Sequence, residues 1–166
     1  MIRRALLILA IALATPTAAQ GECRLCYSDS GKPGERPLEL EIFADLNFAR
    51  LALAGHEGGS AEVDAASGSK RTGGSVVNLG GLPITGRGRV TGEPLREVRI
   101  DLPQSVPMTA PEGGAADLSG FTTDLPSHPT LNANGELNFS FGARLVLRSG
   151  RGGNYRGRIP ITVDYN

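Results

Sequence analysis

The chain has 166 residues, with 17 Lys and Arg against 17 Asp and Glu, so its formal net charge at pH 7 is zero. This balance argues against a general nucleic-acid binder, which carries a basic face. The sequence holds 23 glycines and 11 prolines, lacks tryptophan, and has no long helical pattern. Its composition therefore favours an all-β domain with many turns.

Residues 1–19 have the pattern of a secretory signal peptide. Arg3 and Arg4 precede the ten-residue apolar run Ala5–Ala14, and small residues stand three and one positions before a cut after Ala19. The run is too short to cross a bilayer about 30 Å thick, and no second stretch approaches about 18 apolar residues. We expect an exported protein of the periplasm, cell surface or extracellular space that is not embedded in a membrane.

Residues 20–37 are expected to form a flexible N-terminal arm that carries a C-x-x-C pair, Cys23 and Cys26. In an oxidising compartment this spacing favours a small local disulfide. Redox and metal roles remain alternatives. A redox motif would need a helix in a βαβ context, haem attachment would need His in place of Tyr27, and zinc would need two further ligands at a suitable spacing.

Residues 38–166 are expected to form one β-sandwich domain. Leu38, Leu40 and Ile42 alternate with two glutamates, which predicts a first strand. Residues 46–53 fit both a helical stripe and a strand face, and we expect a strand. Further strands are predicted at 60–64, 75–79, 85–91, 96–102 and 115–123, with proline-rich loops at 103–114 and 124–135.

The segment 137–147 alternates apolar residues, and we expect it to form a hairpin with a long terminal strand at 153–166. One face of that terminal strand is apolar and includes a penultimate tyrosine. The residues expected to form a candidate strand-docking edge are Gly153, Tyr155, Gly157, Ile159, Pro160, Ile161, Val163 and Tyr165. Eight or nine strands at this spacing predict an immunoglobulin-like antiparallel β-sandwich.

Pro160 indicates how this terminal strand pairs. Proline has no N–H to donate, so within a sheet it belongs on an edge strand or at a bulge. An edge is where a partner's extended segment can add by main-chain hydrogen bonds. The alternative is a self-complete sandwich in which Pro160 protects the edge from aggregation. Residues 20–36 lack the alternating apolar run that a donor arm needs, so the chain is expected to accept a strand rather than to donate one.

No other group of residues indicates a catalytic centre, a cofactor site or a metal site. Asp124, Ser127 and His128 are close in sequence, but no nucleophile elbow accompanies them, and two flanking prolines make His128 a loop residue. Four arginines concentrate near the last hairpin. They are Arg148, Arg151, Arg156 and Arg158. We read them as a solvated face, with contact to an anionic polysaccharide or lipid headgroup as the alternative.

Several short motifs, in this order along the chain, resemble a known family. They are Leu46-Asn-Phe48, Gly58-Gly-Ser-Ala-Glu-Val63, Gly73-Gly74, Arg89-Val-Thr-Gly92, Ile100-Asp-Leu-Pro103, Gly142-Ala-Arg-Leu-Val-Leu147, Gly153-Asn-Tyr-Arg-Gly157 and Thr162-Val-Asp-Tyr165. Over roughly residues 36 to 166, the chain is similar to the secreted bacterial family called domain of unknown function 4402. The resemblance implies an immunoglobulin-like sandwich related to fimbrial adhesins and spore-coat-type pilins, and it supplies no catalytic residues.

The sequence therefore predicts a non-enzymatic, pilin-like structural or adhesive protein of the bacterial cell envelope. Its expected partner is an envelope or fimbrial protein that docks by strand addition. A self-contained secreted binding domain without strand exchange is the alternative, and an enzyme ranks third.

Overall fold

The structure is a computed structural model that describes residues 35–55, 57–111, 114–148 and 155–166. In these ranges the regular elements are eleven β-strands, and all of their pairings are antiparallel. The chain is all-β, as its composition predicted. The strands are β1 Glu39–Ala44, β2 Leu51–Leu53, β3 Gly59–Val63, β4 Lys70–Gly74, β5 Val76–Asn78, β6 Gly86–Thr91, β7 Val98–Asp101, β8 Ser105–Thr109, β9 Ala115–Thr123, β10 Glu136–Leu147 and β11 Thr162–Tyr165.

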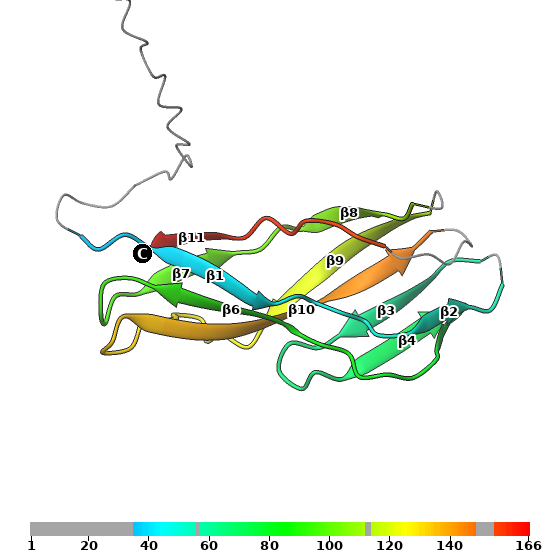
Figure 1. Ribbon diagram of the computed structural model, residues 1–166, viewed down its shortest axis with the longest axis horizontal. Coiled ribbons are helices and arrows are strands. Elements are labelled where there is room, and N and C mark those ends of the chain that lie inside the picture. The colour runs from blue at the N-terminus through cyan, green and yellow to red at the C-terminus, as the bar shows by residue number, and fades with distance from the viewer. Residues whose placement is uncertain (1–34, 56, 112–113, 149–154) are drawn as a thin grey trace, which may run out of the picture.

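The largest sheet is organised around β10. One edge of β10 pairs with β6 through residues 136–141 and with β3 through residues 143–147, while its other edge pairs with β9. β1 lies beyond β6, β4 beyond β3, and β8 beyond β9, which makes a sheet of seven strands. Figure 1 shows β10 along the long axis of the molecule, with β11 toward one end and β2, β3 and β4 toward the other.

Two small sheets, β7 with β11 and β2 with β5, complete the structure. The β7–β11 pair packs on the large sheet through a buried cluster of Leu38, Val90, Val98, Leu131, Phe139 and Phe141. A second buried cluster consists of Ala61, Val76, Val106, Ala116, Leu118, Ala143, Leu145 and Leu147. Leu46 and Ile159 contact both clusters, so the apolar interior is continuous between two layers of strands. This arrangement agrees with the expected sandwich.

The alternating patterns that the sequence predicted are confirmed on the central strands. On β10, Phe139, Phe141, Ala143, Leu145 and Leu147 are all buried. Because successive side chains of a strand point to opposite faces, five apolar residues at every second position place one whole face of β10 in the core. The hydrophobic effect at this face is what holds the long strand in register with its neighbours.

The predicted hairpin between 137–147 and the terminal strand is wrong. β11 pairs with β7, joining Thr162 to Asp101 and Tyr165 to Val98. β10 cannot take a further partner along residues 143–147, because β3 occupies one edge and β9 the other. The terminal strand is also shorter than predicted: regular pairing covers only β11, with one isolated bridge between Arg156 and Thr109.

Two strands, β4 and β8, were not predicted, which raises the number of strands in the described ranges above the expected eight or nine. Strand β8 lies within the segment 103–114, which was predicted to be a loop. The strand forms although it contains Pro107. Its proline is tolerated because β8 pairs along its length with β9 alone and forms a sheet edge, apart from one bridge between Thr109 and Arg156. β4 has no apolar side chain and is mostly exposed, so no alternation marks it in the sequence. Pairing with β3 is what defines it as a strand.

Candidate functional site

The end of the C-terminal segment is fixed by the hydroxyl group of Tyr165. The backbone N–H of Glu93 donates to this oxygen at 2.7 Å, and the hydroxyl donates to the carbonyl oxygen of Arg36 at 2.6 Å. The guanidinium of Arg96 lies 5.0 Å from the centre of the Tyr165 ring. Gly92 permits this approach, because a Cβ there would lie 2.5 Å from the hydroxyl oxygen. Tyr165 therefore joins β11 to the chain just before β1.

Residues 157–161, by contrast, form an unpaired edge. Arg156 exchanges both main-chain hydrogen bonds with Thr109, and β11 resumes pairing at Thr162. Between these two points, residues 157–161 make no main-chain hydrogen bond to any other part of the chain that the structure describes. Figure 1 shows the terminal chain running beside β7 and β8 before it enters β11. The segment is held at both ends and unpaired between them.

Pro160 does not block this edge. The main-chain groups of Arg156 and the N–H of Asn166 point toward β8 and β7. Because main-chain groups of an extended chain alternate in direction, Pro160 shares that side, whereas the N–H groups of Gly157, Ile159 and Ile161 point to the opposite side. The missing N–H of Pro160 therefore leaves the outer edge with its donors.

The segment 45–53 provides a second unpaired edge, which faces residues 157–161. Asn47 pairs with Ile84 on the side away from residues 157–161, and β2 pairs only with β5. Ala49 has a φ of 57°, and this left-handed residue shifts the alternation by one position. Leu46 and Phe48 therefore face the core before Ala49, and Leu51 and Leu53 face it afterwards. This shift explains why the sequence fitted both a helix and a strand.

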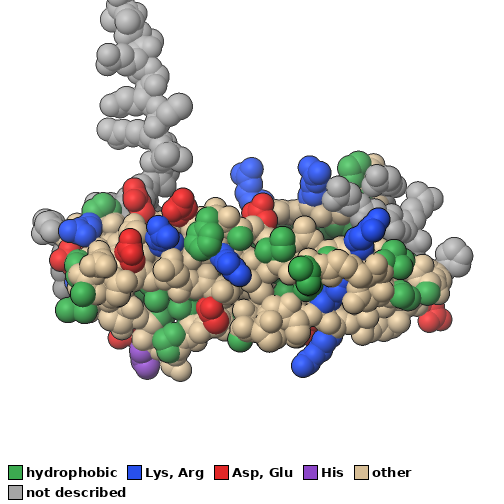
Figure 2. Space-filling model, turned by 60° about the horizontal axis from the view of Figure 1, so that its bottom comes forward, with side chains coloured by type: hydrophobic (Ala, Val, Ile, Leu, Met, Phe, Trp, Pro, Cys, Tyr) green, Lys and Arg blue, Asp and Glu red, His purple; other side chains and the backbone are tan. Residues whose placement is uncertain are grey.

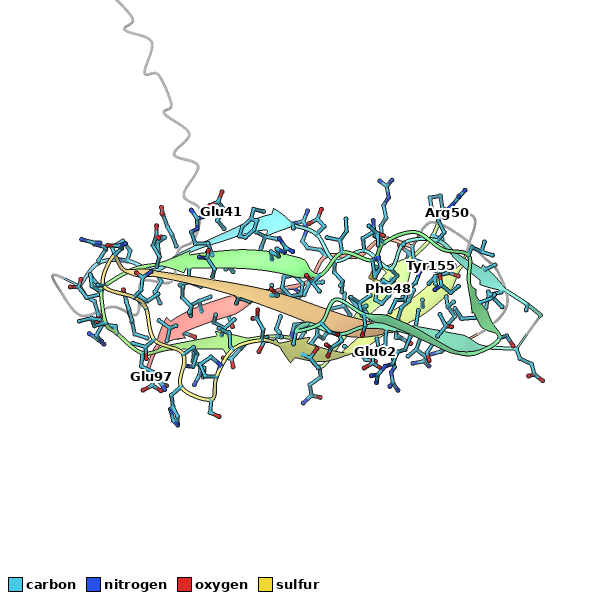
Figure 3. All side chains as sticks on the ribbon, turned by 90° about the horizontal axis from the view of Figure 1, so that it is seen from below. Glu41, Phe48, Arg50, Glu62, Glu97 and Tyr155 are labelled. Carbon is cyan, nitrogen blue, oxygen red and sulfur yellow. The ribbon has the colours of Figure 1, made fainter. Side chains whose placement is uncertain are left out.

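The two edges enclose a groove with an apolar floor. The groove has a volume of about 1170 Å³ and lies between residues 45–53 and residues 155–161. Its floor residues come from β9 and β10 and from the end of β8, and they are Leu118, Phe141, Leu145, Leu147 and Met108. Figure 3 shows Phe48, Arg50 and Tyr155 from the two walls gathered at one end of the molecule.

The groove has basic side chains on its rim. Its lining includes the cations Arg50, Arg156 and Arg158 and one anion, Asp45, which gives 3 − 1 = +2. All three arginines are exposed, and none forms an ion pair with another residue in the described ranges. The face shown in Figure 2 carries both basic and acidic side chains, with hydrophobic side chains between them. The charge of +2 among the residues that line the groove contrasts with the zero formal net charge of the whole chain.

The structure places the residues of the predicted docking edge in three different environments. Tyr155, Gly157, Ile159 and Ile161 line the groove. Pro160 is exposed, and Val163 and Tyr165 belong to the packed β7–β11 pair. Gly153, Arg151, the C-x-x-C pair Cys23 and Cys26, and the predicted signal peptide lie outside the described residues. The opposite wall at 45–53 was not predicted as part of a site, because its role depends on facing the C-terminal segment.

The other polar candidates are not brought together. Asp124 accepts a hydrogen bond from the backbone N–H of Ser140 at 2.7 Å. His128 lies in a loop, as predicted, and its Nδ1 is 2.8 Å from Oε1 of Glu97. Arg148 forms an ion pair with Asp117 at 2.6 Å rather than joining the arginines of the groove.

Two carboxylates are affected by local hydrogen bonds. The hydrogen bond with His128, followed by one from the amide of Asn166 at 2.7 Å, lowers the pKa of Glu97. The hydroxyl and backbone N–H of Ser67 lower the pKa of Asp64 in the turn between β3 and β4. Both carboxylates are on the surface and belong to turns or strand ends. Their shifts therefore reflect local structure.

Within the described ranges, no helix has the length and apolar character to cross a membrane. No group of three or more His, Cys, Asp or Glu in those ranges is arranged to hold a metal ion.

The described residues thus form an antiparallel β domain with an apolar groove between two unpaired edges. Residues 38–165 match the family described as Domain of unknown function (DUF4402), and the chain belongs to this family. The resemblance seen in the sequence is thereby confirmed. No curated protein and no solved structure matches the chain.

Proposed function

We propose that this chain is an exported, non-enzymatic, pilin-like structural or adhesive protein of the bacterial cell envelope, with an immunoglobulin-like sandwich that accepts an extended segment of a partner protein. The groove between residues 45–53 and 155–161 carries the proposal. Each of its walls presents an unpaired main-chain edge, and its floor is apolar. Main-chain hydrogen bonds and alternating side-chain pockets are the two requirements for strand addition.

Export is supported by the signal-peptide pattern of residues 1–19. The arm at 20–36 lacks an alternating apolar run, so the chain would act as an acceptor, such as a tip or terminal subunit, rather than as a repeating donor. The expected partner is therefore another protein of the envelope or fimbria.

Hydrogen exchange tests the proposal directly. In the isolated protein, the amides of Gly157, Ile159 and Ile161 should exchange rapidly, whereas the amides of β7 and β10 that pair within the sheets should be protected. Adding an extended peptide of alternating apolar and polar residues should protect Gly157, Ile159 and Ile161. Amides that are already as protected as β7 in the isolated monomer would refute an acceptor groove and favour a self-complete binding domain.

A second measurement separates strand addition from ordinary ligand binding. If an anionic polysaccharide binds at the rim but leaves the exchange of residues 157–161 unchanged, the protein is a self-contained binding domain. Strand addition requires new main-chain hydrogen bonds, so a bound strand must slow exchange at alternate residues of the wall.

A further inference from the structure

The groove contains a charge pattern that specifies its partner more closely. We propose that the segment accepted by the groove alternates apolar residues with acidic ones. This inference rests on the proposed function, because it describes the chemistry of the strand that enters the same groove.

The side chains of an inserted strand that point inward would meet an apolar floor. The floor residues Leu118, Phe141, Leu145 and Leu147 are each at most 6% exposed, and none carries a polar group. Side chains that enter here lose their water contacts and meet only apolar groups. Every second residue of the partner segment must therefore be apolar.

The side chains of an inserted strand that point outward would meet the arginines of the rim. Arg156 and Arg158 are exposed on the outer face of one wall, at positions that alternate with the inward-facing Ile159. Arg50 is exposed on the opposite wall. The outward residues of an inserted strand would lie between these walls, directly beside the arginines, at cross-strand distances of about 5 Å between Cβ atoms. Both walls therefore present cations to these side chains, and Asp45 is the one anion among the residues that line the groove.

The three arginines of the rim have no competing ion-pair partner in the described ranges. No ion pair there involves Arg50, Arg156 or Arg158, whereas four other arginines are paired, namely Arg96, Arg99, Arg144 and Arg148. Acidic residues directly opposite arginines stabilise paired strands, and basic residues opposite them destabilise the pairing. The rim therefore favours a partner strand with outward Asp or Glu.

The chain's own arm does not fit this description, which points to a different protein as the partner. Residues 20–34 contain no run that alternates apolar and acidic residues. The segment Leu38–Ile42 does alternate in this way, but it lies in and next to β1, which pairs with β6.

The experiment compares three nine-residue segments, each presented at the end of a soluble monomeric carrier. All three have Val or Ile at alternate positions, and the intervening positions hold Glu, Ser or Lys. Affinities are measured by calorimetry with the protein lacking residues 1–19, at low and at high salt. We expect the Glu segment to bind about 5- to 30-fold more tightly than the Ser segment, and the Lys segment to bind most weakly. High salt should reduce these differences.

Matched variants identify the residues responsible. Replacing Arg156→Gln together with Arg158→Gln should remove most of the preference for Glu over Ser. Arg87→Gln is the control, because Arg87 is an exposed arginine on β6 that does not line the groove. That control should keep the preference. All of these changes are at exposed side chains, and circular dichroism confirms that each variant is folded.

The outcomes separate this inference from the proposed function. If all three segments bind equally, or if the Lys segment binds best, the charge specificity is wrong while strand acceptance stands. If no segment binds or protects residues 157–161 from exchange, the proposed function fails and the inference fails with it. If the preference for Glu persists in the double variant, the arginines of the rim are not its cause and the inference is overturned.

Discussion

The hydroxyl group of Tyr165 should contribute measurably to stability, and Tyr165→Phe tests this with the loss of one oxygen atom. The variant loses two hydrogen bonds, to Glu93 and to Arg36. A net contribution of about 0.5–1.5 kcal/mol for each bond gives about 1–3 kcal/mol. Arg36 is exposed, so water can replace its bond in part. We therefore expect a loss of about 1–2 kcal/mol, while the contact between Arg96 and the ring remains.

Urea unfolding of the protein lacking residues 1–19 measures this loss. With a slope of about 2 kcal/mol per molar urea, the midpoint should fall by about 0.5–1 M with an unchanged slope. Thr162→Val is the matched control, because it removes a hydroxyl from the same strand at an exposed position with no side-chain hydrogen bond among the described residues. If Tyr165→Phe shifts the midpoint no more than Thr162→Val, the hydroxyl does not fasten β11 to the chain before β1, and that reasoning is refuted.

Gly142→Ala on β10 should destabilise the protein by about 3 kcal/mol or more, because a Cβ there would overlap the carbonyl of Val63 and lie 2.8 Å from the backbone nitrogen of Ala65. Gly73→Ala is the control, because the nearest atom to a Cβ at residue 73 is 3.4 Å away. Thermal unfolding compares the two variants, and equal losses of stability would contradict the predicted overlap at Gly142. Glu97 should titrate below its ordinary pKa in a pH series followed by NMR, and His128→Ala should raise that pKa more than a change at Asn166, because the bond with His128 is the larger cause. The pKa of Glu97 is lower in the folded protein than in the unfolded chain. The contact therefore stabilises the fold above the ordinary titration range of a glutamate, and this stabilisation is lost as the pH falls through the folded pKa. A Glu97 pKa that is unchanged in the His128→Ala variant would contradict this assignment.

Most of the strands could be predicted from the sequence because their patterns are local. The alternation of apolar residues in β10 and in the segment around β7 indicates that one face of each strand is buried. This prediction can be made without knowing which strand is the partner. β4 and β8 could not be predicted in this way. β4 has no apolar side chains, and β8 contains Pro107, so only their pairing with β3 and β9 defines them.

One wall of the candidate site could be predicted from the sequence, and the other could not. The sequence predicted the apolar face of the C-terminal segment and the position of Pro160 at a sheet edge. The opposite wall was not, because Ala49 shifts its alternation and because its relation to residues 157–161 spans more than 100 positions of the chain. The predicted pairing of the last strand with 137–147 was wrong for a related reason: both edges of β10 along residues 143–147 were already taken by β3 and β9.

The sequence by itself determined that this is an all-β chain whose terminal segment has one apolar face, since composition and alternation are local properties of the residues. Only the tertiary structure decided how that segment pairs. It shows residues 157–161 without a main-chain partner in the described ranges, opposite a second unpaired edge and above an apolar floor. The reason is physical: an unpaired edge is a relation between distant strands, and it exists only once every other strand has taken its place.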